Sequence, residues 1–198
     1  MNPIALIGGF APLVLFALLD QRIPVASAAA LGAAAALVIV MVISRHAIAT
    51  VPLVQALALA AIAVIAFVGD AQTKHFLAVY GRGLASLTLA AFMLLTAPFA
   101  PFTAPMARGG VPRELWHSPR FLETNRKIST AWGFAVLVMG LANLAVAVIG
   151  SQQPHAQMNL LRWAPTVIVV LFAFRYTRRV VAEAQAGRGA APQPRSRF

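Results

Sequence analysis

The sequence predicts an all-α protein, a polytopic bundle of transmembrane helices with six spans. Of its 198 residues, 60% are hydrophobic and only 11% are charged, whereas a soluble domain carries ~45–50% apolar and ~25% charged residues. The 16 Lys and Arg residues outnumber the 5 Asp and Glu residues, and they lie between and after the apolar runs, as in membrane proteins. This composition excludes an ordinary soluble enzyme, a disordered chain and a nucleic-acid-binding domain, and it predicts the lipid bilayer as a partner.

Each span is expected where an apolar run approaches the ~20 residues that a helix needs to cross a bilayer. The first run, residues 4–19, is short and contains Gly8, Gly9 and Pro12, so we expect a kinked, tilted or re-entrant segment. It lacks a basic n-region, and Asp20 with the residues after it makes no cleavage site, so we expect it to stay in the mature chain. The other five spans are expected at residues 25–43, 51–68, 84–99, 128–149 and 161–174.

Two polar stretches accompany the spans. The loop at about residues 100–127 is interrupted by Pro and Gly and contains Ser118-Pro119, an N-cap followed by Pro at the first helical position. A helix from Pro119 to Ile149 has 31 residues, about 46 Å at 1.5 Å each, and so projects beyond the bilayer. Residues 177–198 predict a disordered basic cytoplasmic tail after a transmembrane domain at 1–176.

The distribution of Lys and Arg predicts the orientation of the chain. With six spans, one side holds the N-terminus, the 44–50 loop, the 100–127 loop and the tail, and it carries twelve basic residues against four on the other side. Because the more basic side faces the cytoplasm, both termini are predicted to be cytoplasmic. Trp116, Trp132 and Trp163 lie in loops or near predicted helix ends, where an indole ring is expected at the membrane interface.

Small residues at helical spacing predict where the spans pack closely. They are Ala28, Gly32 and Ala36 in the second span, Ala56 and Ala60 in the third, and Gly133 and Gly140 in the fifth. These faces are expected within the bundle or between protomers, so a homo-oligomer stays open. Asn143 is the one strongly polar side chain deep inside a span, and we expect it to hydrogen-bond to another helix, with a substrate contact as the alternative.

The titratable residues form no recognisable catalytic or metal-binding constellation. The five acidic and four His residues fall at predicted helix ends, in loops or in the tail, and no two pair convincingly. No motif for a nucleophile, zinc or a phosphate loop is present, and the lack of Cys excludes disulfides and thiolate sites. We therefore expect a non-enzymatic protein with no catalytic residue, cofactor or metal. A coupled transporter would place an acid or a base within a span.

The fifth span carries a recognisable pattern. It reads Lys127-Ile-Ser-Thr-Ala-Trp132, then seven residues, then Gly140-Leu-Ala-Asn143. This pattern resembles the bacterial intracellular septation protein A family, and the apolar opening from Phe10 to Leu18 looks like that family's N-terminal segment. The likeness extends to about Tyr176. The longer 100–127 loop, the entry Arg162-Trp163-Ala164 to the last span and the basic tail depart from the family pattern and indicate a divergent member.

The resemblance implies a multi-pass protein of the bacterial inner (plasma) membrane that supports cell division, septation and envelope maintenance through protein–protein contacts. It implies membrane proteins of division and cell-wall synthesis as partners, and no known catalytic residues. The positions on which we expect packing and the placement of the helix to depend are Lys127, Trp132, Gly133, Gly140 and Asn143.

Two other functions remain open. A small transporter or channel for a lipid-like or uncharged solute would contain a cavity lined by Asn143, Thr88 or Ser86. A membrane enzyme that acts on lipid would bring together Glu114, His117 and Glu123 of the 100–127 stretch, because acid–base catalysis needs such groups within hydrogen-bond reach.

Overall fold

The computed structural model describes residues 10–43, 50–149 and 155–189, and every regular element in them is helical. The elements are α2 (Ala11–Leu19), α3 (Val25–Ile43), α4 (Thr50–Val68), α5 (Ala71–Thr96), α6 (Ala104–Arg108), the short 3₁₀ helix η1 (Arg113–Leu115), α7 (Pro119–Ile149) and α8 (His155–Gly189).

Four of the helices, α3, α4, α5 and α7, are long and apolar enough to cross a membrane. The all-α prediction is confirmed, and four of the six predicted spans correspond to these helices, so the chain is a multi-pass membrane protein. The six-span count itself is not shown. The described part of the first predicted span is the nine-residue α2, too short to cross a bilayer alone, and residues 4–9 lie outside the described residues. The sixth predicted span, 161–174, lies within the 35-residue α8.

Two helices extend further than the sequence predicted. The fourth span, expected to begin at Leu84, belongs to a helix that begins at Ala71, because Asp70 caps it by accepting a hydrogen bond from the Thr73 N–H at 2.8 Å. The last helix continues to Gly189, into the stretch expected to be disordered, and the rest of that stretch, 190–198, lies outside the described residues. Arg179 and Glu183, paired at 2.9 Å one turn apart, favour the helical continuation.

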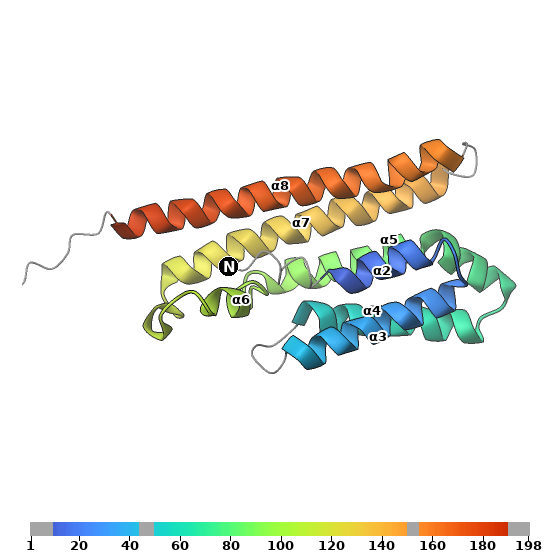
Figure 1. Ribbon diagram of the computed structural model, residues 1–198, viewed down its shortest axis with the longest axis horizontal. Helices are drawn as coiled ribbons and strands as arrows, with labels where there is room; N and C mark the ends of the chain where they lie inside the picture. The colour runs from blue at the N-terminus through green and yellow to red at the C-terminus, as the bar shows by residue number, and fades with distance from the viewer. Residues whose placement is uncertain (1–9, 44–49, 150–154, 190–198) are drawn as a thin grey trace, which may run out of the picture.

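The helices run alternately up and down, so their ends gather at two ends of the molecule (Figure 1). At one end α3 gives way to α4, α5 gives way to α6, η1 and α7, and α8 finishes. We call it the basic end, because Arg108, Arg113, Arg120 and Arg179 lie there. At the other end, which we call the far end, α2, α4 and α7 finish and α3, α5 and α8 begin.

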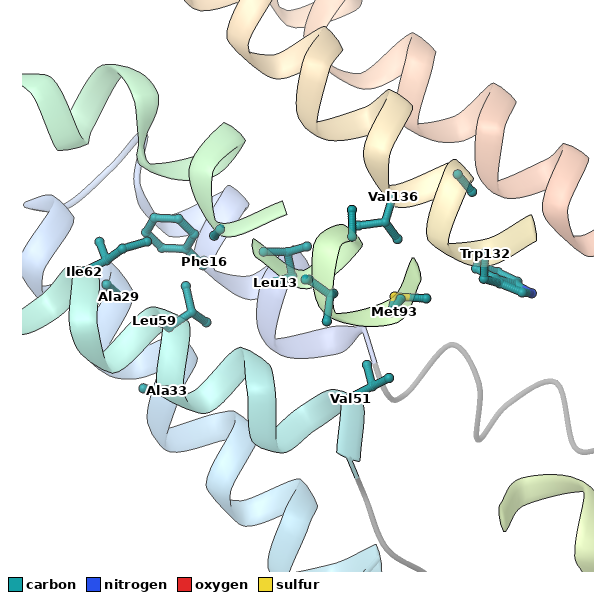
Figure 2. Packing of buried hydrophobic residues seen from close by; sticks show 14 of the residues in the cluster. Leu13, Phe16, Ala29, Ala33, Val51, Leu59, Ile62, Met93, Trp132 and Val136 are labelled. Atoms are coloured by element: carbon teal, nitrogen blue, oxygen red, sulfur yellow. The ribbon is translucent and has the colours of Figure 1, made fainter. Parts of the chain in front are cut away.

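Small residues bring α3 against α2 and α4. Ala28, Gly32 and Ala36 are all buried, and a Cβ on Gly32 would lie 2.9 Å from Leu59 Cδ1 of α4. In Figure 2, Leu59 and Ile62 of α4 point toward Phe16 of α2. This close approach gains van der Waals contact, which holds helices together where lipid provides no hydrophobic driving force.

Helices α5 and α7 interlock through glycines. A Cβ on Gly133 would lie 2.7 Å from Leu94 Cδ2, and one on Gly140 would lie 2.9 Å from Leu87 Cδ2. The two glycines and the two leucines are each seven residues apart and run in opposite directions, so the helices pack antiparallel with a leucine over each glycine. One turn further along, the glycine is on α5 and the leucine is on α7, because the Leu144 side chain packs against Gly83.

The outward faces of the long helices are strongly apolar. Met41 is 72% exposed, Phe67 80% and Phe172 67%, on three different helices. A soluble monomer rarely exposes large apolar side chains over so many elements, and lipid is the solvent that stabilises them.

Candidate functional site

A narrow groove of about 140 Å³ lies between α2, α5, α7 and α8. Its walls are almost entirely apolar. They are formed by Phe10, Leu13, Val14, Ala17, Arg82, Ser86, Trp132, Ala135, Val136, Met139, Asn143, Trp163, Thr166, Val169, Val170 and Phe174. Because four helices from both halves of the chain contribute, the groove is a property of the folded bundle rather than of any one sequence segment.

The far-end side of the groove contains an ion pair between α2 and α5. Arg82 Nε donates to Asp20 Oδ2 at 3.2 Å, and Arg82 Nη2 donates to Asp20 Oδ1 at 2.5 Å and to the Ala17 carbonyl at 2.6 Å. The two side chains are only 11% and 7% exposed. Such a bidentate pair is the geometry in which a buried carboxylate and guanidinium compensate one another best.

The position of this ion pair corrects one expectation. Arg82 was expected between two spans, yet it lies eleven residues after the first residue of α5, about 16 Å along the helix. Asp20 was expected at a helix end, and it is the C-cap residue of α2 and binds Arg82. Burying ionisable side chains in a membrane helix bundle costs free energy that pairing only partly offsets, and such residues often belong to ligand or ion pathways.

The glycines that flank Arg82 explain how the pair forms. Gly81 and Gly83 are both buried. A Cβ on Gly81 would lie 3.7 Å from the Phe16 ring of α2, whereas Gly83 receives Leu144 of α7. The two glycines therefore let α5 approach both neighbours, and this approach brings Arg82 to the end of α2.

Asn143 lies on α7 beside the ion pair. Its Nδ2 donates to the Met139 carbonyl at 3.0 Å, one turn earlier in the same helix. The sequence predicted a hydrogen bond to another helix, and the hydrogen bond that the structure shows is intrahelical instead, because an amide can reach the carbonyl four residues back. Asn143 is half-buried and lines the groove.

A second, polar pocket adjoins the groove. Its volume is about 210 Å³, and it is lined by Asp20, Gln21, Ala78, Val79, Arg82, Asn143 and Ala147. Arg82 and Asn143 line both cavities. They therefore form the boundary between an apolar groove and a polar chamber.

The other end of the groove is closed by aromatic side chains around Trp132. Phe10 stacks on the Trp132 ring at 5.4 Å, and Phe174 meets it edge-on at 5.3 Å. The Trp132 Nε1 donates to Thr177 Oγ1 of α8 at 3.0 Å, and the side chain is 3% exposed. Trp132 was expected at the membrane interface. It is instead buried inside the bundle, because α7 begins at Pro119 and places it well within the helix.

The other residues singled out from the sequence fall into separate places. Gly133 and Gly140 face α5, and Lys127 is exposed and pairs with Glu123 at 2.7 Å, away from the groove. Glu123 is therefore engaged on its own helix. Among the described residues, His, Asp and Glu side chains form no group of three placed to hold a metal ion.

Sequence reasoning missed the pairing of Asp20 with Arg82, whereas it named Ser86 and Asn143, which both line the groove, as candidate cavity residues. The length of the fourth apolar run could have indicated that Arg82 lies in a membrane helix. Residues 84–99 number only 16, fewer than the ~20 that a span needs. Extending that run toward the N-terminus carries Gly81, Arg82 and Gly83 into the membrane helix.

The chain has no detectable relatives in three comparisons. No protein-family profile matches it, and neither the curated proteins nor the solved structures yield a match. The groove and the sequence pattern of the fifth span are therefore the features of this protein that indicate a function.

Proposed function

We propose that the protein is a small membrane transporter or carrier that binds a lipid-like, uncharged solute in the groove. One observation supports this function best: an apolar groove lined by Ser86 and Asn143 continues into a polar pocket at one end. A cavity of this kind is the default ligand site in a helix bundle, with a few polar groups that fix the orientation of the solute. A bundle used only as a scaffold gains nothing from such a hollow.

We propose that this carrier has six spans, with α2 completing a first membrane segment and α8 supplying the last one. Both termini would be cytoplasmic in a bacterial inner membrane. The alternation of helix directions and the excess of basic residues at the basic end support this layout.

The groove can be tested by filling it. Ala135, a buried wall residue, is replaced by Phe, and Leu141, a half-exposed residue on the same helix, is replaced by Phe as the control. In proteoliposomes, a brominated long-chain alcohol should quench the fluorescence of Trp132 and Trp163, which line the groove. Quenching that A135F abolishes and L141F retains supports the function, whereas equal quenching of both variants contradicts it.

A second function comes from the Lys127–Asn143 pattern in the fifth span. The resemblance of this pattern to the septation protein A family supports a non-enzymatic role in septation and envelope maintenance, through contacts with division and cell-wall-synthesis proteins. The two proposals are compatible, because a carrier can also work within a larger membrane complex.

Crosslinking in native membranes tests the second function. A photoreactive residue at Phe67, which is 80% exposed on α4, should capture a division or wall-synthesis protein. The same residue at the buried Leu59 serves as the control. Recovery of no such protein above the Leu59 background would remove the support for this role.

A further inference from the structure

We propose that a hollow between α7 and α8 at the basic end binds the headgroup of an anionic phospholipid from the surrounding leaflet. The phosphate lies between Lys127 and Arg179, and the acyl chains lie along the outward apolar surface of the same two helices. This surface lies outside the groove, and the inference does not depend on the carrier function.

The hollow is large and rich in charged side chains. Its volume is about 400 Å³, and among its described lining residues are three cations, Arg120, Lys127 and Arg179, and two carboxylates, Glu123 and Glu183. A cavity of about 150 Å³ holds one benzene molecule, so a hollow of this size has room for a phosphodiester headgroup.

The antiparallel packing of α7 and α8 places Lys127 level with Arg179. The Trp132 ring of α7 meets the Phe174 ring of α8 at 5.3 Å. Lys127 lies five residues from Trp132, and Arg179 lies five residues from Phe174, both toward the basic end, about 8 Å along each helix. The two cations therefore lie at the same height on opposite walls of the hollow.

The two carboxylates lie farther from the apolar part of the bundle than the cations. Glu123 pairs with Lys127 at 2.7 Å and Glu183 pairs with Arg179 at 2.9 Å, each from one turn nearer the tip of the basic end. All four side chains are at least 56% exposed, and such exposed pairs contribute little stability. A phosphate on the membrane side therefore meets the cations first and has no strong ion pair to break.

The length of α7 places Lys127 at the surface of the membrane. Ile149 is the last residue of α7 and is 58% exposed. Lys127 lies 22 residues before it, about 33 Å along the helix, and the hydrocarbon core of a bilayer is about 30 Å thick. With Ile149 at one boundary of the core, Lys127 is at the level of the opposite headgroups.

An apolar surface leads from the hollow toward the middle of the membrane. Phe134 lies seven residues from Lys127 on α7, and Phe172 lies seven residues from Arg179 on α8, so each pair shares a helix face. The two rings are 55% and 67% exposed, and Tyr176 of the hollow stacks on Phe172 at 6.5 Å. A free phosphate or an acidic protein gains nothing from this surface, whereas a phospholipid contacts it with its acyl chains.

Further arginines beside the hollow favour an anion. Arg126 and Arg178 are the chain neighbours of Lys127 and Arg179, and Arg175 lies one turn before Arg179. All three arginines are exposed, and no carboxylate of the described residues lies within 4.0 Å of them. Each basic residue near a leaflet strengthens the attraction of anionic lipid about fivefold. The surroundings of the hollow therefore attract an anion although two carboxylates line it.

Native mass spectrometry of the full chain, titrated with lipid in detergent, measures the dissociation constant of the first bound lipid. Dioleoyl phosphatidylglycerol should bind about tenfold more tightly than dioleoyl phosphatidylcholine. The variant K127Q/R179Q should lose most of this preference. The control R108Q/R113Q, which removes two exposed cations of the basic end away from the hollow, should retain it.

Removing the carboxylates should have the opposite effect. E123Q/E183Q leaves both cations and removes their partners, so it should tighten the binding of phosphatidylglycerol. Because the four substituted side chains of the hollow are exposed, all variants should fold, and thermal unfolding in the same detergent checks this.

Three outcomes would overturn the proposal. Equal affinity of the wild type for the two lipids would show that the hollow does not select an anion. Equal losses in K127Q/R179Q and R108Q/R113Q would show that the charge of the whole basic end attracts the lipid. Displacement of the lipid by excess inorganic phosphate or by polyglutamate would identify a soluble anion or an acidic protein as the occupant.

Discussion

At the scale of single residues, the Asp20–Arg82 pair carries the largest energetic consequence. Desolvating two charges is expensive, and their mutual attraction offsets that expense only when both partners are present and hydrogen-bonded. The pair has three hydrogen bonds of 3.2 Å or less and little exposure. Replacing one partner should therefore destabilise the protein more than replacing both.

Replacing Arg82 with Met should lower the free energy of unfolding by about 3–5 kcal/mol, because it removes the guanidinium that hydrogen-bonds to the buried Asp20 carboxylate. The double variant D20N/R82M should lose clearly less, since the desolvated carboxylate is removed together with the guanidinium. Equilibrium unfolding in detergent measures both values. Arg108→Met, at an exposed position of the basic end, is the control and should change little. Equal losses in the single and double variants would contradict the pairing.

Asp70 is the residue whose titration should influence stability at low pH. Two hydrogen bonds from Thr73 hold the pKa of Asp70 below its ordinary value. The one from the Thr73 side chain has the larger effect, and the one from its backbone N–H has the smaller effect. A depressed pKa in the folded state gives stability that is present above the unfolded value of about 3.9 and is lost as the pH falls through the folded pKa.

Asp70→Asn should remove this pH dependence, because an amide oxygen still caps α5 but does not titrate. Carboxyl NMR of the wild type should give a pKa for Asp70 below that of a reference peptide. The protection of the Thr73 amide against hydrogen exchange, relative to its intrinsic rate at the same pH, should fall at acidic pH only in the wild type. An Asp70 pKa equal to that of the reference peptide would contradict the prediction that the cap of α5 contributes to the pH dependence of stability.

At the scale of elements, the sequence predicted the existence of the long helices better than their ends and their contacts. The apolar runs located α3, α4 and α7 well, because a long run without charges is stable in the hydrocarbon core of a membrane and not in water. The short fourth apolar run indicates that α5 begins before Leu84, but the partner of Arg82 was not predictable from hydropathy, because Asp20 lies 62 residues away in the sequence. The buried position of Trp132 likewise depends on Thr177, 45 residues later.

The interlock of α5 and α7 predicts a compensating pair of substitutions. Gly133→Val should destabilise the protein by about 1–3 kcal/mol, because its new atoms would overlap the Leu94 side chain. Adding Leu94→Ala makes room and should recover part of the loss. Gly109→Val is the matched control, since a Cβ there meets nothing within 4 Å.

Thermal unfolding of the wild type, G133V, L94A, the double variant G133V/L94A and the control G109V in the same detergent tests this interlock. The effects of Gly133→Val and Leu94→Ala should be non-additive, as expected for residues in contact. Strict additivity would mean that the two side chains do not meet and that α5 and α7 pack in a different register.

At the scale of the whole molecule, the layout of six spans is open to direct measurement. The chain contains no Cys, so single cysteines report their own position without background. His117→Cys at the basic end should react with an impermeant maleimide only after the cells are opened, and Gln72→Cys at the far end should react in intact cells. The reverse pattern would invert the orientation, and labelling of both in intact cells would refute the layout.

The two helices that form one side of the groove also form the basic end of the molecule. α7 and α8 lie side by side and continue without interruption from Asn143 and Trp163 to Arg120 and Glu183, where Arg120 Nη2 donates to the Glu183 carbonyl at 3.4 Å. Because an α-helix is stiff over such lengths, these two helices connect the basic end mechanically to the groove. A force on their ends at the basic end, from lipid headgroups or from a docked protein, would therefore widen or narrow the groove.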